Sequence, residues 1–184
     1  MRIQLFLILC GCAPKPPLST GPVQRSDHTA IAEQVHVRIN QIRAQHGLEK
    51  LAWEKPLARA ATGHSRDMAK RDYFDHHSPE GNDFSFRYEK VDFTCRVPAG
   101  SHRFLTGGEN IHKTWRAEAT RTWSDGRKEE TGIRTIPEVA EQAVQGWMNS
   151  PGHRKNILTP EWQSEGIGVW VRSDGAVFIT QNFC

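Results

Sequence analysis

The chain has 184 residues, a formal net charge of +3 and a mean hydropathy of −0.62. This length predicts one domain with a tail, and it is long enough to bury a sizeable core. Basic and acidic side chains are interspersed, without the basic stripe that is typical of nucleic-acid-binding proteins, so we expect no nucleic-acid partner. The composition therefore indicates a polar, soluble domain.

The N-terminus resembles an export signal. Arg2 supplies a positive charge, and the almost wholly apolar run over residues 3–9 is too short to span a bilayer as a helix. Gly11 before Cys12, with Leu9 further upstream, resembles a bacterial lipobox. We predict a signal peptide over residues 1–11 and a lipid on Cys12, which would anchor the chain to a membrane of the cell envelope. Plain secretion, a misplaced start codon and a buried N-terminal strand are the alternatives.

A Pro-rich segment follows the cysteine, and residues 12–26 are predicted to be an extended, solvated linker. Residues 27–184 are the predicted folded domain. Apolar residues at helical spacing predict a helix over about 28–45, which Gly47 ends, and a second helix runs from Pro56 to about residue 72. Residues 73–105 are rich in Gly, Pro, Asp and Phe, so we expect a loop with short turns.

The second half of the domain begins with a strongly charged stretch. Residues 112–135 are predicted to be a surface insertion, helical or disordered. A helix follows over 137–148, and residues 153–158 form one further turn. Two strands, over 166–172 and 176–183, are joined by a hairpin turn signal. Helices that precede an antiparallel hairpin indicate an α+β domain instead of a parallel βαβ sheet.

Two cysteines, Cys95 and Cys184, lie within the predicted domain. In an exported protein, two cysteines that are not part of the targeting signal usually form a disulfide. We predict a disulfide that ties the middle loop to the final strand, with two free thiols as the alternative.

Five sequence motifs follow one another along the domain: Asn40-x-x-Arg43 with Gly47-Leu48-x-x-Leu51-x-Trp53; Ala60-Ala61-x-x-His64-Ser65-x-Asp67-Met68; Tyr73-Phe74-Asp75-His76-His77-Ser78-Pro79-Glu80-Gly81; Gly108-Glu109-Asn110-Ile111; and Trp147-Met148-Asn149-Ser150-Pro151-Gly152-His153-Arg154-x-Asn156-Ile157-Leu158, which leads into Gly166-Ile167-Gly168-Val169. In order and content they resemble the bacterial branch of the CAP superfamily, named for cysteine-rich secretory proteins, antigen five and pathogenesis-related proteins. The likeness covers about residues 28–183.

The resemblance implies an α-β-α sandwich, with a central antiparallel sheet between helical layers. It also implies an open cleft lined by His76, Glu109 and His153. His77 is the alternative to His76, although the spacing to the Ser-Pro turn favours His76. Animal and plant relatives often carry a second glutamate, where this chain has Ser150 or a neighbour. The acidic part of the cluster is therefore incomplete.

Several chemistries are open to this trio. Two imidazoles and one carboxylate can ligate zinc or another divalent metal and activate a water, as in metal-dependent hydrolases and peptidases. Without a metal, Glu109 and a histidine could form an acid–base pair. A serine nucleophile, Ser78 or Ser150, is a third option, but both serines are ordinary turn residues. The trio could also be a purely structural polar network.

Other residues of these motifs have plainer interpretations. His64 lies on the buried stripe of the second helix and is expected to be a core histidine. Trp53 and Trp147 are expected to pack in the core. Arg87 and Arg154 could bind an anion, but pairing with an acidic side chain is the simpler expectation.

The sequence thus predicts an exported lipoprotein of the periplasm or the cell surface. Its cleft would bind a lipid, a cell-wall component or an envelope protein, through a divalent metal or without one. A metal-dependent hydrolase and an envelope-structural protein without a ligand are the alternatives. No substrate follows from the sequence, because one fold serves many functions.

Overall fold

The computed structural model describes residues 22–24 and 26–184, so the predicted signal peptide, Cys12 and most of the predicted linker lie outside the described residues. The helices are α1 (His28–Gln45), α2 (Lys55–Arg71), α3 (Phe84–Glu89), α4 (Ile136–Asn149) and α5 (Pro151–Ile157). The strands are β1 (Ala52–Trp53), β2 (Val97–Pro98), β3 (Phe104–Leu105), β4 (Gly108–Trp115), β5 (Ala117–Thr122), β6 (Lys128–Ile133), β7 (Ser164–Val171) and β8 (Ala176–Phe183).

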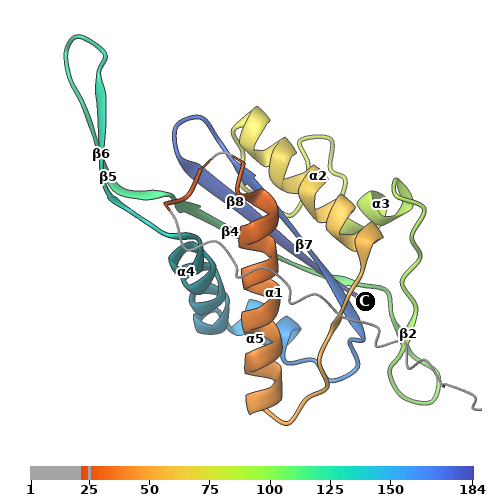
Figure 1. Ribbon diagram of the computed structural model, residues 1–184. Coiled ribbons are helices and arrows are strands. Elements are labelled where there is room, and N and C mark those ends of the chain that lie inside the picture. The colour runs from red at the N-terminus through yellow and green to blue at the C-terminus, as the bar shows by residue number, and fades with distance from the viewer. Residues whose placement is uncertain (1–21, 25) are drawn as a thin grey trace, which may run out of the picture.

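A four-stranded sheet in the order β1-β7-β8-β4 forms the middle layer. The long strands β7 and β4 both pair antiparallel with β8, and only the short β1 pairs in parallel with β7. Helices α1, α4 and α5 cover one face, whereas α2, with α3 beside it, covers the other (Figure 1). The α-β-α sandwich that the resemblance implied is therefore confirmed.

The larger part of the core lies between the sheet and α1 with α4. Ile31, Val35 and Ile39 of the predicted stripe on α1 are fully buried. The helix ends where Gly47 adopts a φ of +70°, a conformation that favours glycine. The helix boundaries predicted from apolar spacing therefore agree closely with those observed for α1.

The first motif is structural. The Asn40 side chain exchanges two hydrogen bonds with the backbone of Leu51, at 2.7 and 3.0 Å. Arg43 is fully buried, and its guanidinium donates to the carbonyls of Glu49, Ile157, Thr159 and Trp162. One buried cation thus satisfies loop carbonyls that would otherwise lack donors, and it fixes α1 to the segment after α5.

The Gly166-x-Gly168 motif lets α2 approach β7 closely. A Cβ on Gly166 would lie 2.1 Å from the Ala58 nitrogen, and one on Gly168 would lie 1.9 Å from the Thr62 nitrogen. Real Cβ atoms do not come this near to backbone, so only glycine allows the helix to pack directly on the strand.

The predicted disulfide is present. Cys95 and Cys184 are bonded, with their Cα atoms 5.5 Å apart. Because Cys184 follows β8, the bridge ties the segment between α3 and β2 to the end of a central strand of the sheet.

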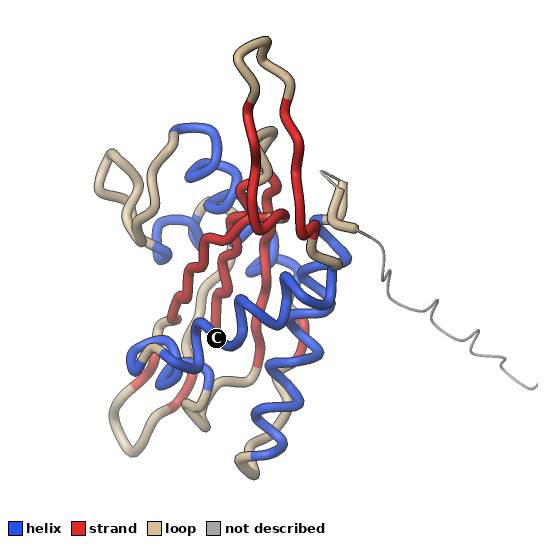
Figure 2. The backbone as a smooth tube through the Cα atoms, turned by 90° about the vertical axis from the view of Figure 1, so that its left-hand side faces the viewer, coloured by secondary structure: helices blue, strands red, loops and turns tan. Residues whose placement is uncertain are grey.

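Three expectations are wrong. Residues 112–115 belong to β4, an edge strand of the four-stranded sheet, and the rest of 112–135 is largely a β-hairpin, β5–β6, that projects from the body (Figure 2), so this region is neither helical nor disordered. Residues 73–105 contain the helix α3 and the short β2–β3 pair. Trp53 is 37% exposed, whereas Trp147 is fully buried as expected.

Within the described part of the chain, none of the helices combines the length and the apolar character that crossing a bilayer requires.

Candidate functional site

Glu109 lies near the start of the edge strand β4, and its side chain is only 1% exposed. One carboxylate oxygen, Oε1, contacts Nδ1 of His76 at 2.9 Å, and the other, Oε2, accepts a hydrogen bond from Arg87 at 2.6 Å. With its amide nitrogen turned toward the carboxylate, Asn182 donates to Oε2 at 3.2 Å. Both oxygens of this buried carboxylate are therefore occupied by donors of the same chain.

Arg87 reaches the carboxylate because α3 holds it there. The Asp83 side chain caps α3 by accepting hydrogen bonds from the backbone nitrogens of Ser85 and Phe86. The guanidinium also donates to the carbonyls of Asn82 and His76, at 3.2 and 3.0 Å. Arg87 thus neutralises Glu109 and, through the carbonyl of His76, also fixes the loop that carries this histidine.

His64 of α2 lies behind this pair. It is 2% exposed, as expected for a core histidine, and its Nε2 atom lies 3.0 Å from the carbonyl oxygen of Asp75. The same atom is 3.9 Å from Oε1 of Glu109. Burial lowers the pKa of His64 more than the nearby carboxylate raises it. His64 is therefore a neutral residue that supports the loop after α2.

His153 approaches from the other face of the sheet. It lies in α5, and its ring centroid is 6.2 Å from that of His76. Asn110 donates to the carbonyl of His153 at 3.2 Å, and Asn156 donates to the side chain of Asn110 at 2.9 Å. The Asn-Ile and His-Arg-x-Asn motifs are thus joined by amide hydrogen bonds. These bonds hold His153 next to Asn110, whereas His76 contacts the neighbouring residue, Glu109.

His112 is a further site residue that sequence reasoning missed. It lies two residues after Asn110 on the same face of β4, and its ring packs edge-on against Trp147 at 6.3 Å. Its Nε2 atom is buried and has no hydrogen-bond partner among the described residues. Burial, with a smaller contribution from repulsion by His153, lowers the pKa of His112 to about 4. The alternation of polar residues after Glu109 is the signal that could have found it.

We expect this buried histidine to make the fold sensitive to acid. Because the pKa of His112 falls from 6.5 in the unfolded chain to about 4 in the folded protein, the unfolded state binds more protons between these values. The free energy of unfolding therefore decreases as the pH falls from 6.5 toward 4, by about 2–3 kcal/mol from this residue. Urea unfolding at a series of pH values measures this slope.

The variant His112→Phe keeps a ring of similar shape without the titrating nitrogens, so we expect a shallower slope. His77→Phe is the matched control, because the side chain of His77 is 61% exposed. An unchanged slope in His112→Phe would contradict the assignment.

The remaining predicted residues lie apart from this arrangement. His77 contacts Asp75 at 3.5 Å instead of Glu109. The hydroxyl of Ser78 donates to Glu80 at 2.9 Å, and among the described residues no hydrogen bond joins Ser78 or Ser150 to a histidine. Arg154 lies 3.5 Å from His46. These contacts give no support to a serine nucleophile.

The sequence profile described as "CAP: Cysteine-rich secretory protein family" matches residues 37–183, which include all the residues of the cleft. The chain belongs to the CAP family. Its homologues in this family include extracellular proteins, in agreement with the predicted export.

Two relatives of this CAP chain come from Bacillus subtilis (strain 168). One, named uncharacterized membrane protein YlbC, is 31% identical over 92% of this chain and 38% of its own length. The other, named uncharacterized protein YkwD, is 32% identical over 86% of this chain and 48% of its own length. The chain thus spans less than half the length of either relative.

Solved structures agree with the fold. An extracellular protein with an SCP domain from Bacillus anthracis is 30% identical, with a TM-score of 0.59 over 89% of this chain and 44% of its own. An outer surface protein from Borrelia burgdorferi is 15% identical, with a TM-score of 0.59 over 89% of this chain and 96% of its own. The second likeness shows the fold alone.

The side-chain geometry fits only part of the predicted metal-ligand set. Among residues 22–24 and 26–184, no three His, Cys, Asp or Glu side chains gather closely enough to hold one ion. Glu109 is engaged at both oxygens by His76 and Arg87. The two imidazoles of His76 and His153 remain available as ligands. Glu109 fits the role of the carboxylate that orients a ligating histidine.

Proposed function

We propose that this chain is an exported, lipid-anchored CAP module whose cleft binds a divalent metal ion through His76 and His153. The ion would leave coordination positions open for oxygen atoms of a lipid, a cell-wall component or an envelope protein. The chain is thus a binding module instead of a hydrolase.

The contact between His76 and Glu109 carries this proposal. A neutral imidazole that donates its Nδ1 proton to a carboxylate keeps a lone pair on Nε2, which is the usual arrangement of a metal-ligating histidine. Burial, with repulsion from His76, lowers the pKa of His153, which favours a neutral ring at pH 7. Imidazole ligands suit zinc and similar ions. The structure of NaASP2, a protein of the same fold at 13% identity, was solved with Zn2+.

The same contacts argue against the hydrolase alternative. A general base must lie within hydrogen-bond reach of the water whose proton it takes. The Glu109 side chain is only 1% exposed, and its two oxygens face His76 and the Arg87 cation instead of solvent. Glu109 therefore supports the cleft, and no other carboxylate contacts His76 or His153 among the described residues.

Zinc titration by calorimetry tests the metal site. We expect stoichiometric binding to the full chain, and loss of binding in both His76→Ala and His153→Ala. Glu109→Gln should bind about 10–100-fold more weakly, because the orienting carboxylate is gone. His77→Ala is the control and should bind normally. Absence of zinc binding by the unmodified chain would reject the proposal. Retention of the zinc-loaded chain on lipid vesicles or on wall fragments then identifies the ligand class.

The anchor is tested separately. If lipid on Cys12 holds the chain to the membrane, Cys12→Ala should move it from the membrane fraction to the soluble fraction of the envelope, because a folded domain without an acyl chain has no comparable hold. Cys10→Ala, which alters the neighbouring cysteine of the signal, is the control and should remain with the membrane. Fractionation and immunoblotting measure the outcome, and membrane retention of Cys12→Ala would contradict the lipobox.

A further inference from the structure

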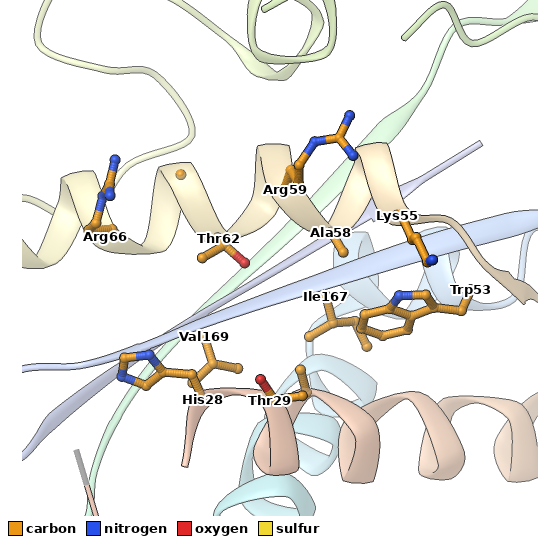
Figure 3. A pocket seen from close by; sticks show the side chains of 12 residues that line it. His28, Thr29, Trp53, Lys55, Ala58, Arg59, Thr62, Arg66, Ile167 and Val169 are labelled. Atoms are coloured by element: carbon orange, nitrogen blue, oxygen red, sulfur yellow. The ribbon is translucent and has the colours of Figure 1, made fainter. Parts of the chain in front are cut away.

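A groove lies at the edge of the sheet opposite to β4, the strand that carries Glu109. It has a volume of about 620 Å³ and lies between α1 and α2, along the outer edge of β7. The side chains of Thr29 and Thr62 reach toward it from the two helices, and Trp53 and His28 lie toward its two ends (Figure 3). None of these residues belongs to the His76–His153 cleft.

The floor of the groove is the edge of a β-strand. The backbones of Ser164 and Cys184 exchange hydrogen bonds at 2.7 and 2.9 Å, and the backbone nitrogen of Arg172 donates to the carbonyl of Ala176 at 2.8 Å. In an antiparallel ladder this pattern directs the peptide groups of even-numbered residues of β7 toward β8, and those of odd-numbered residues outward. The outward groups therefore include the N–H and C=O of Ile167 and Val169.

Both ends of this edge have partners, but its middle does not. At one end, the backbone carbonyl of Glu165 accepts a hydrogen bond from the backbone nitrogen of Glu54 at 2.8 Å, one residue beyond the end of β1. At the other end the Val171 nitrogen donates to Nε2 of His28 at 3.1 Å. Between them, no hydrogen bond joins the outward groups of Ile167 and Val169 to another described residue. These two residues are 2% and 1% exposed, so unpaired peptide groups there are unfavourable.

The walls of the groove leave space for an extended chain. The residues that face it from the helices include Ala32, Ala58 and Gly63, which have small side chains or none. The two glycines of β7 hold α2 close to one face of the strand, as described above. The open edge of β7 therefore lies at the base of the groove, next to the end of β1 along the same edge.

The charge of the lining is one-sided. Lys55, Arg59 and Arg66 line the groove from α2, and the described lining contains no aspartate or glutamate. None of these three cations forms an ion pair with a described residue. Lys55 and Trp53 both line the same end of the groove (Figure 3). A partner with negative charges along its length would complement this wall.

We propose that this groove binds an extended acidic segment of a partner protein, which adds a strand to the open edge of β7. Main-chain hydrogen bonds to Ile167 and Val169 would hold the segment, and the α2 cations would select acidic side chains. A peptide fits this floor better than an acyl chain, because a hydrocarbon would leave the peptide groups of Ile167 and Val169 unpaired.

A blocked octapeptide of alternating glutamate and valine serves as the probe, with the full chain purified in its exported form. We expect saturable binding by fluorescence anisotropy, no binding of the matching lysine–valine peptide, and at least about tenfold weaker binding of the acidic peptide with N-methylated valines. Backbone exchange measured by NMR gives a direct readout. The amides of Ile167 and Val169 should slow on binding, whereas that of Gly168, which faces β8, should not change.

Two variants locate the site. Ala58→Phe places a ring in the groove, and Lys55→Gln combined with Arg59→Gln removes two cations; each should weaken binding about tenfold or more. Arg154→Gln, on α5, is the control and should bind normally. Thermal unfolding checks that the Ala58→Phe chain is folded. If it is not, the double variant Lys55→Gln/Arg59→Gln still tests whether the peptide binds in the groove.

Three outcomes would overturn the proposal. The first is absence of binding by the acidic peptide, and the second is unchanged exchange at Ile167 and Val169 in its presence. The third is displacement of the peptide by sodium palmitate together with palmitate binding that is lost in Ala58→Phe, which would assign the groove to an acyl chain. Because zinc binding at His76 is measured independently, failure here leaves the proposed function of the cleft intact.

Discussion

Removal of the disulfide is expected to destabilise the fold strongly. Cys95 and Cys184 are separated by 89 residues, and the enclosed chain contains β4, α4 and both central strands β7 and β8. Closing a loop of this length restricts the unfolded chain, which corresponds to about 4 kcal/mol in the chain-entropy model. We expect Cys95→Ser/Cys184→Ser to lower the free energy of unfolding by about 2–5 kcal/mol and the midpoint of thermal unfolding by about 10 °C.

Reduction provides the matched control for this experiment. Dithiothreitol should lower the unfolding midpoint of the unmodified chain to that of the double variant, and it should have no effect on the double variant itself. A midpoint of the unmodified chain that is indifferent to reductant would show that the bridge contributes nothing to stability. Neither cysteine contacts His76 or His153, so zinc binding by the folded double variant should persist.

Local sequence signals were sufficient to locate α1, β7 and β8. The stripe of α1 and its terminal Gly47 placed the helix correctly, and the hairpin turn located β7 and β8 to within two residues. Each of these signals depends only on residues that are close together in the sequence. The spacing of side chains and the conformation of a glycine need no knowledge of distant contacts.

Residues 112–115 of β4 were misassigned because several of the side chains that this strand buries are polar. On β4, Asn110 and Thr114 are buried and face amide partners, and His112 is largely covered between them. Charged and polar residues usually indicate a surface, so this strand of the main sheet could not be recognised from the sequence. Only the pairing of β4 with β8, which joins residues about 60–75 positions apart, makes this polarity compatible with burial.

The partners of Glu109 could not be derived from the sequence for a related reason. The resemblance supplied the trio but not its internal bonding. The sequence indicated no specific acidic partner for Arg87 or Arg154. Arg87 reaches Glu109 only because α3 docks against the start of β4. Trp53 was expected in the core because of its size, yet it lies at one end of the groove, since the short β1 terminates there.

Replacement of Arg87 is expected to lower the stability of the fold about as much as removal of the disulfide. Its side chain is 12% exposed, and it is the cation that compensates the buried carboxylate of Glu109. Removing one partner of a buried ion pair leaves the other charge desolvated, so Arg87→Met should lower the free energy of unfolding by about 3–5 kcal/mol. Zinc binding should weaken as well, because the loop of His76 loses the hydrogen bond to its carbonyl. Urea unfolding and calorimetry measure the two effects.

A double variant separates the ion pair from simple loss of packing. In Arg87→Met combined with Glu109→Gln no uncompensated carboxylate remains, so most of the lost stability should return, whereas zinc affinity should stay low because His76 has no orienting carboxylate. Arg71→Met is the matched surface control, since Arg71 pairs with Glu80 in solvent and its removal should change stability little. If Arg87→Met is as stable as the unmodified chain, Glu109 is not held by this pair. The orientation of His76 must then come from its contact with the carboxylate alone.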